Sequence, residues 1–153
     1  MKKLFISVYT LSLAGLILLG CQTEPCFFPK EPRLLLLIYK TTDTLVTNKE
    51  IDKIYAENLS DTIVPVFVKG GLLLPLRQDI DNTSFKIKFK NYTDTFRIAV
   101  SYTRKISLAS SECGYVTLYE QLKPVSHNFD TLFTDRSFID TSYAVNMRSY
   151  LQY

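Results

Sequence analysis

The feature that most limits the fold of this chain is a strict alternation of apolar and cationic residues near its middle. Across residues 85–90, two phenylalanines and an isoleucine alternate with three lysines. Successive side chains of a β-strand point to opposite faces, so this period of two predicts a strand with one buried and one cationic face. Phe96, Ile98, Val100 and Tyr102 repeat the period after a polar turn. We therefore expect the two segments to form an antiparallel hairpin.

Most of the chain beyond residue 33 shows similar strand patterns. Leu34–Tyr39 is a continuous apolar run, which is typical of a strand buried on both faces. Residues 51–59 would suit a strand or a helical turn, and we favour a strand. Gly70-Gly71 indicates a turn, and Pro75 suggests an edge strand or a bulge. The other expected strands are Ile63–Val68, Leu72–Leu76, Tyr115–Leu122, Phe129–Phe133, Ser137–Ile139 and Ala144–Leu151.

The spacing of these strands predicts the fold class. They recur about every ten residues, turn signals separate them, and few segments show a helical period. This pattern favours an all-β fold, an immunoglobulin-like β-sandwich of about seven to nine antiparallel strands.

The start of the chain has the parts of an export signal. Two lysines follow the first methionine, and Leu4–Leu19 is almost wholly apolar. Leu18–Cys21 resembles a lipobox, in which the cysteine thiol receives a diacylglycerol and the cysteine becomes the new N-terminus. We therefore expect residues 1–20 to be a lipoprotein signal peptide and Cys21 to be the lipidation site. The alternative is an uncleaved anchor with a chance cysteine, although the apolar stretch is slightly short for a membrane span.

Cleavage at this position defines the remaining domain organisation. Residues 21–32 contain the lipidated cysteine and three prolines, which favours a short, stiff tether. Residues 33–153 have the length of a single domain, the β-sandwich. Loss of the two leader lysines leaves 18 − 2 = 16 basic against 15 acidic residues, a net charge near +1. This balance gives no reason to expect a nucleic-acid partner.

Two cysteines besides Cys21 are present, Cys26 and Cys113. An exported chain enters an oxidising compartment, which favours a disulfide between them. The two residues are 113 − 26 = 87 positions apart, and closing such a loop would stabilise the fold by about 4 kcal/mol. A pair of buried free thiols is the alternative.

The dipeptide Asp-Thr occurs five times, with its threonines at Thr44, Thr62, Thr95, Thr131 and Thr141. Asp suits turns and Thr suits the start of a strand, so turn chemistry alone could explain the repetition. In four of the five cases an apolar residue follows, and this pattern also resembles the O-glycosylation acceptor of exported Bacteroidota proteins. Both interpretations stay open, and the five threonines are candidate acceptors.

Several segments together resemble a known family. They are the lipobox cysteine and the cysteine after it, the apolar run ending in Tyr39, Leu72–Leu76, Ser84-Phe85, Asp94–Phe96, Tyr102 and Ser110–Tyr115. The chain is similar, over nearly its whole mature length, to a family of small uncharacterised lipoproteins of Bacteroidota with a domain of unknown function. The most specific segment is Glu112-Cys113-Gly114. The resemblance implies location and architecture and carries no mechanism.

We find no residues that predict catalysis. The one histidine, His127, has no partner in the sequence that would mark a catalytic or zinc site. Gln78–Thr83 places oxygen atoms at alternate positions as calcium loops do, but Ser84 and Lys90 stand where such a loop needs glycine and an acid. The lysines of residues 86–90 could contact anionic lipid or glycan, or could simply form a solvated face. We expect no enzyme activity, no metal and no cofactor.

The function class expected from this pattern is a non-enzymatic lipoprotein of the cell envelope that binds or supports another envelope component. An outer-membrane protein is the first partner to consider. A module that binds glycan, peptide or metal is the alternative, and a concave cluster of tyrosines, or of Asp79 and Asp81, would favour it. Only one acid, Glu24, lies just after Cys21. Export to the cell surface is associated with several acids there, so we expect an outer-membrane protein facing the periplasm.

Overall fold

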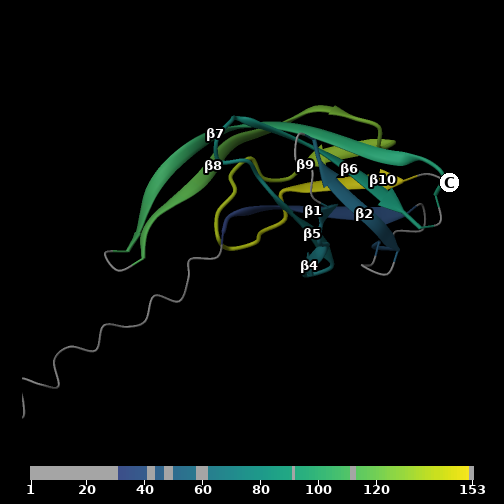
Figure 1. Cartoon of the computed structure of the whole chain (residues 1–153), viewed down its shortest axis with the longest axis horizontal. Helices are drawn as coiled ribbons and strands as arrows, with labels where there is room; N and C mark the ends of the chain where they lie inside the picture. The colour runs from purple at the N-terminus through teal and green to yellow at the C-terminus, as the bar shows by residue number, and fades with distance from the viewer. Residues whose placement is uncertain are drawn as a thin grey trace, which may run out of the picture.

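The computed structural model describes residues 31–40, 44–46, 50–57, 62–90, 92–110 and 113–151, and these residues form two packed five-stranded sheets (Figure 1). The first sheet has the order β4-β5-β1-β10-β9, formed by Val66–Val68, Gly71–Pro75, Arg33–Lys40, Met147–Leu151 and Thr131–Thr134. The second has the order β3-β2-β6-β7-β8, formed by Thr62–Ile63, Ile51–Ala56, Asn82–Phe89, Thr95–Ser110 and Gly114–His127. The predicted all-β sandwich is confirmed, although the described part has ten strands rather than seven to nine.

The alternating segments form the hairpin expected for them. β6 and β7 pair in antiparallel fashion, with Ile87 opposite Phe96. The alternating apolar side chains of Phe85–Phe89 and of Phe96–Tyr102 are buried in the core between the sheets. Phe89 meets Phe96 edge to face at 5.3 Å between ring centroids, and Phe129 stacks on Phe96 at 5.4 Å. Burying side chains of this size stabilises the fold by about 1.5–3 kcal/mol each.

β1 lies at the centre of the first sheet and is buried on both faces, as its apolar run predicts. Leu34, Leu35 and Leu36 are fully buried. β5 pairs with β1 in antiparallel fashion, whereas β10 pairs with it in parallel, with Leu36 opposite Met147. The first and last described strands are therefore neighbours, and the expectation of antiparallel strands throughout is wrong at this one pair.

The segment expected as one strand at Ile63–Val68 is instead divided between the two sheets. β3 ends at Ile63 and pairs with β2, whereas β4 starts at Val66 and pairs with β5. The chain crosses over at Val64-Pro65, where proline has no N–H to give to a strand ladder. The turn predicted at the glycines is a two-residue turn, Lys69-Gly70, with positive φ at both residues.

Pro75 does not mark an edge strand. It is the last residue of β5, which lies between β4 and β1, and it stands opposite Arg33. At the end of a strand, the missing N–H interrupts little of the ladder.

The predicted strand at Ser137–Ile139 is wrong. Only an isolated bridge from Ile139 to Tyr119 forms there.

β7 and β8 extend well beyond the segments expected for them. Figure 1 shows both strands continuing past the rest of the second sheet as a curved two-stranded projection. We call this projection, formed by Lys105–Ser110 of β7 and Gly114–Leu118 of β8, the arm. Its strands are paired, with Ile106 opposite Thr117 and Leu108 opposite Tyr115.

Candidate functional site

The base of the arm holds a buried pair of tyrosines. Tyr102 on β7 and Tyr119 on β8 meet edge to face, with ring centroids 5.0 Å apart. Burial above all raises the pKa of Tyr119 to about 12 and also raises the pKa of Tyr102. Both phenols are therefore neutral at physiological pH, and their rings close the end of the core beneath the arm.

A chain of hydrogen bonds fixes the Tyr102 ring. Its hydroxyl donates to the carbonyl oxygen of Arg77 at 3.0 Å and lies 2.6 Å from the Thr83 hydroxyl. The Thr83 oxygen also accepts the N–H of Arg77 at 3.1 Å. Since Tyr102 uses its proton on Arg77, Thr83 is left to donate to Tyr102. This network ties the β5–β6 connection to β7.

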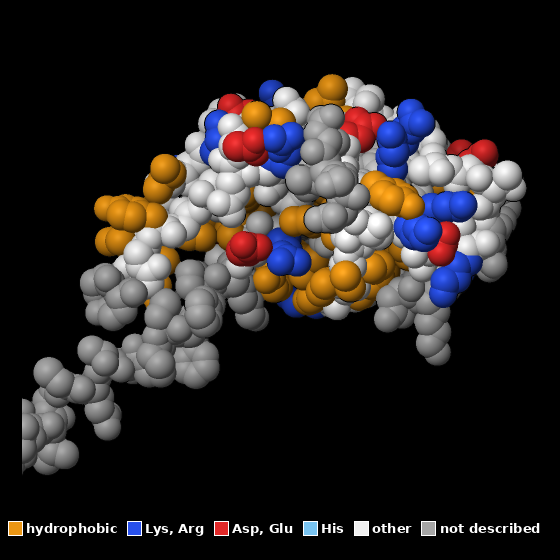
Figure 2. All heavy atoms as spheres, in the orientation of Figure 1, with side chains coloured by type: hydrophobic (Ala, Val, Ile, Leu, Met, Phe, Trp, Pro, Cys, Tyr) orange, Lys and Arg blue, Asp and Glu red, His pale blue; other side chains and the backbone are white. Residues whose placement is uncertain are grey.

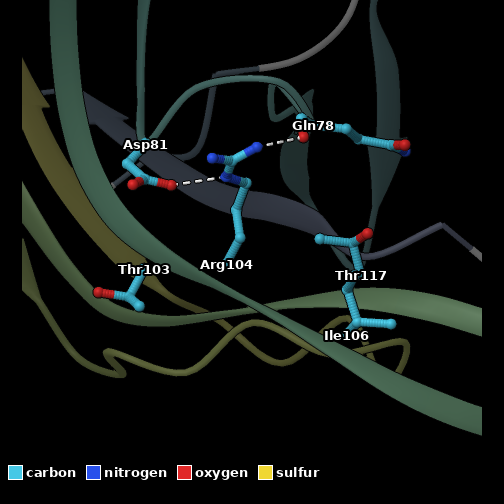
Figure 3. Close-up of a pocket in the computed structure, with 6 residues that line it drawn as sticks. All are labelled: Gln78, Asp81, Thr103, Arg104, Ile106 and Thr117. Carbon is cyan, nitrogen blue, oxygen red and sulfur yellow. Dashed lines mark hydrogen bonds and ion pairs between the residues drawn. The ribbon is translucent and has the colours of Figure 1, made fainter.

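An arginine from β7 reaches over the same connection. Arg104 Nε donates to Asp81 Oδ1 at 2.6 Å, and its Nη1 donates to the carbonyl oxygen of Gln78 at 2.5 Å (Figure 3). These residues, with three from the two arm strands, line a pocket of about 340 Å³; the lining residues are Gln78, Asp81, Thr103, Arg104, Ile106 and Thr117. The pocket therefore offers a salt-bridged pair, hydroxyl groups and one apolar side.

The oxygen-rich loop singled out in the sequence uses its carboxylates on arginines. Asp79 accepts two hydrogen bonds from Arg77, one of them 2.9 Å long from Nε, and this pairing lowers the pKa of Asp79. Asp81 lines the pocket, whereas Asp79 does not. In the described part of the chain, no cluster of three or more His, Cys, Asp or Glu side chains could hold a metal ion.

The arm exposes large apolar side chains on one face. Ile106, Leu108 and Tyr115 are 72%, 59% and 75% exposed. Leu108 and Tyr115 are direct partners, and Ile106 lies two residues from Leu108, so the three share a face. Figure 2 shows hydrophobic side chains gathered at this end of the molecule. The sequence analysis missed this surface because a strand with alternating apolar residues has the same sequence pattern whether its apolar face is covered or exposed.

A second hollow lies at the far end of the β6–β7 hairpin. It measures about 650 Å³ and is lined by Tyr92, Thr93, Asp94, Thr95, Phe96, Arg97, Asn128 and Asp130. The side chain of Asn128 bridges its walls, since it accepts the N–H of Arg97 and donates to the carbonyl oxygen of Thr95. Two of the five Asp-Thr pairs, at Thr95 and Thr131, therefore lie close to one hollow.

The five Asp-Thr threonines are spread over the described part of the chain. Thr62, Thr95 and Thr131 are each the first residue of a strand, as the turn interpretation expects. Thr141 follows Asp140 in a turn, and the carboxylate of Asp140 accepts the N–H of Ser142 at 2.9 Å. Thr44 and Thr62 are exposed, and the other three are partly buried.

The other candidate residues lie apart from the pocket. His127 is exposed at the end of β8, where its Nδ1 lies 3.1 Å from the carbonyl oxygen of Phe129. In the cationic row, Lys86 pairs with Glu57 at 3.2 Å, and Lys88 and Lys90 are exposed. 

Of the three cysteines, the structure describes only the last. Cys113 lies in the turn at the tip of the arm, and its N–H donates to the Ser110 hydroxyl at 2.9 Å. Cys21, the predicted lipidation site, and Cys26, the predicted disulfide partner, lie outside the described residues, as do the predicted leader and most of the predicted tether. Among the described residues, no helix has the length and apolar character needed to cross a bilayer.

Comparison with known proteins gives no functional assignment, so the proposals below depend on the sequence, the fold and the site. No protein-family model, no curated protein and no solved structure matches this chain.

Proposed function

We propose that this chain is a lipid-anchored lipoprotein of the cell envelope whose β-sandwich serves as a non-enzymatic binding or structural module for another envelope component. The observation that carries the proposal is the Leu18–Cys21 lipobox after a charged start and an apolar stretch. A cysteine acylated at this position holds a protein at a membrane without a spanning helix, because several acyl chains together bind firmly. An outer-membrane protein is the proposed partner, and the periplasmic face of the outer membrane is the proposed location.

The arm supports a binding role. It exposes Ile106, Leu108 and Tyr115 to solvent on a projecting hairpin. Exposure of neighbouring apolar side chains to water is unfavourable, and such patches mark interaction surfaces. The charged groups at its base are already engaged with one another, Arg104 with Asp81 and Arg77 with Asp79. Such paired charges favour a positioning role in the fold over proton transfer to a substrate.

We also propose a disulfide between Cys26 and Cys113. Two arguments support it: an exported chain enters an oxidising compartment, and lipidation would occupy the thiol of Cys21, leaving Cys26 as the partner of Cys113. The bond would fasten the tether to the tip of the arm. The resemblance to the Bacteroidota lipoprotein family fits this proposal, because its most specific segment, Glu112-Cys113-Gly114, contains Cys113.

The anchoring and the partner can be tested in one experiment. The wild-type chain and a Cys21→Ser variant are expressed in the native host with a photo-crosslinking residue at Val125 or at Phe133, exposed positions on the two sheets outside the arm, and membrane and soluble fractions are compared. Wild type should be in the membrane fraction and should crosslink reproducibly to one envelope protein from at least one of these positions, whereas Cys21→Ser should lose both properties. Equal distribution of the two chains, or no specific crosslink from either position, would count against the proposal.

A ligand-binding module is the second candidate, and the pocket beside Arg104 favours it. The salt-bridged Arg104 and Asp81, with Thr117 opposite, could bind a small polar group of a glycan or a peptide. Arg104→Met keeps the length of the side chain and removes its charge. If the pocket binds a ligand, this variant should abolish a saturable heat of binding to envelope glycan fragments, whereas Lys105→Met on the same strand should not.

Glycosylation of the candidate threonines is a separate proposal. The exposed Thr44 and Thr62 are the most accessible of the five. Protein isolated from the native host should then exceed the mass of polypeptide plus lipid, and the excess should fall when both threonines are replaced by valine. A mass equal to polypeptide plus lipid would exclude the modification.

A further inference from the structure

We propose that the tip of the arm contacts the lipid bilayer to which the chain is anchored, through the apolar face formed by Ile106, Leu108 and Tyr115. The inference rests on the proposed lipidation of Cys21 and extends it. The anchor would then be one of two attachments, and the arm would fix the orientation of the sandwich above the membrane.

The composition of the arm is unlike that of the surface elsewhere. From Ile106 to Leu118 the sequence contains a single charged residue, Glu112; the others are apolar residues, serines, one threonine, one glycine and one tyrosine. The other ionic groups lie at the base of the arm, where Lys105 pairs with Glu120 at 3.0 Å and Arg104 with Asp81. Segments with few charges and with exposed aliphatic residues and tyrosine suit the membrane interface, where tyrosine rings lie at headgroup level.

The exposed face of the arm continues the core face of the second sheet outward, past Arg104 and Thr117 of the pocket. Tyr119 is buried at the base, and Tyr115, four residues nearer the tip on the same face, is exposed. The ladder of hydrogen bonds between β7 and β8 supports the arm along this length. The exposed face is therefore held in a fixed direction rather than carried on a loop.

The length of the tether limits how far this face can lie from the membrane. Glu31, the first described residue, is 31 − 21 = 10 positions after Cys21, so the sandwich begins at most about 35 Å from the acylated cysteine. Glu31 lies near the base of the arm, because it pairs with Arg33 at 3.2 Å and Arg33 lies opposite Pro75. The carbonyl oxygen of the next residue, Leu76, accepts the Tyr119 hydroxyl. The proposed Cys26–Cys113 bond shortens the span from lipid to tip to five positions of chain, at most about 18 Å, plus about 6 Å across the disulfide.

The chain has no tryptophan, so a single introduced tryptophan gives an unambiguous fluorescence signal. Full-length lipidated protein carrying Tyr115→Trp is incorporated into phosphatidylcholine vesicles with and without brominated acyl chains. Phe133→Trp, on exposed β9 of the other sheet, is the matched control, and Leu108→Trp is the second probe if Tyr115→Trp fails to fold. We expect brominated lipid to quench the arm probes at least about two-fold and to leave the control unquenched.

Flotation of the vesicles separates this proposal from the lipid anchor on which it rests. Protein that floats and is quenched at the arm supports both. Floating without quenching overturns the arm contact and leaves the anchor intact. A blue-shifted arm probe that iodide and brominated lipid both fail to quench overturns it too, because the face would then be covered by protein, with tether residues 26–30 as the first candidate. Failure to float overturns the anchor and the arm contact together.

Discussion

The side chains of Tyr119 and Tyr115 lie on one face of β8, four residues apart, yet the first is 2% exposed and the second 75%. The boundary between the sandwich core and the open face of the arm falls between them. Tyr119 is covered by Tyr102 and the β5–β6 connection, whereas the strands beyond it have no opposite sheet among the described residues. The arm is thus an extension of the core face of the second sheet beyond the edge of the first.

Burial of Tyr119 predicts a loss of stability in alkali. Its pKa of about 12 in the fold exceeds the value near 10 in the unfolded chain, so between these pH values the unfolded chain releases a proton that the fold retains. The free energy of unfolding should therefore fall as pH rises through this window, by about 2 kcal/mol from this residue. Urea unfolding at several pH values should show a shallower fall for Tyr119→Phe. The exposed Tyr115→Phe is the control, and equal slopes for the two variants would contradict the assignment.

Thr83→Val tests the hydrogen-bond network around Tyr102. Valine fills the same space but neither accepts the N–H of Arg77 nor donates to the Tyr102 hydroxyl. Buried groups left without partners cost about 1–3 kcal/mol, and the midpoint of chemical unfolding should shift accordingly. Thr103→Val removes a hydroxyl from an exposed position on β7 and should change stability by less than about 0.5 kcal/mol. A Thr83→Val protein as stable as Thr103→Val would show that the network contributes nothing.

Asn146 joins the first sheet to the loop that precedes β10. The buried side chain accepts the N–H of Leu35 at 3.0 Å and donates to the carbonyl oxygen of Phe138 at 3.1 Å. Asn146→Ala should lower the free energy of unfolding by about 2–3 kcal/mol, because both backbone groups lose their partner in a dry environment. Asn128→Ala, which also removes two hydrogen bonds to backbone but at an exposed site, should cost under about 1 kcal/mol. Equal losses would mean that burial of Asn146 is unimportant.

The proposed disulfide predicts a pattern of non-additivity. Cys26→Ser and Cys113→Ser should each lower the free energy of unfolding by about 4 kcal/mol, and the double variant should lose no more than either single one. Reductant should bring the wild type to the same level. A non-reducing peptide map should contain one crosslinked peptide with both residues. Losses that add in the double variant, or a crosslink from Cys113 to Cys21, would rule out the pairing.

The sequence predicted the parts of the fold that depend on neighbouring residues. The period of two in residues 85–90 places Phe85, Ile87 and Phe89 in the core, and the continuous run at Leu34–Tyr39 forms a strand buried on both faces, because burial pattern and side-chain direction are local properties of a strand. The division of Ile63–Val68 was missed. Each half has strand character, and only the partners of the two halves, β2 and β5, show that they belong to different sheets.

The candidate site could be predicted in part. Asp79 and Asp81 were singled out for their oxygen atoms, but their arginine partners were not predicted. The pairing of Asp79 with Arg77 depends on the directions of the two side chains. The pairing of Asp81 with Arg104 joins residues 23 positions apart in the sequence. The open face of the arm was missed for a different reason. Ile106 and Leu108 have the pattern of core residues, and only the tertiary structure shows that the first sheet ends before it reaches them.

Lipidation of Cys21 is the step on which the anchoring, the short tether and the bilayer contact of the arm all depend. Mass spectrometry of the N-terminal peptide from the mature protein tests it most directly. The predicted result is a peptide that lacks residues 1–20 and begins with Cys21 carrying a diacylglycerol, with this peptide absent from a Cys21→Ser variant. A peptide that begins at Met1, or one in which Cys21 is unmodified, would contradict it.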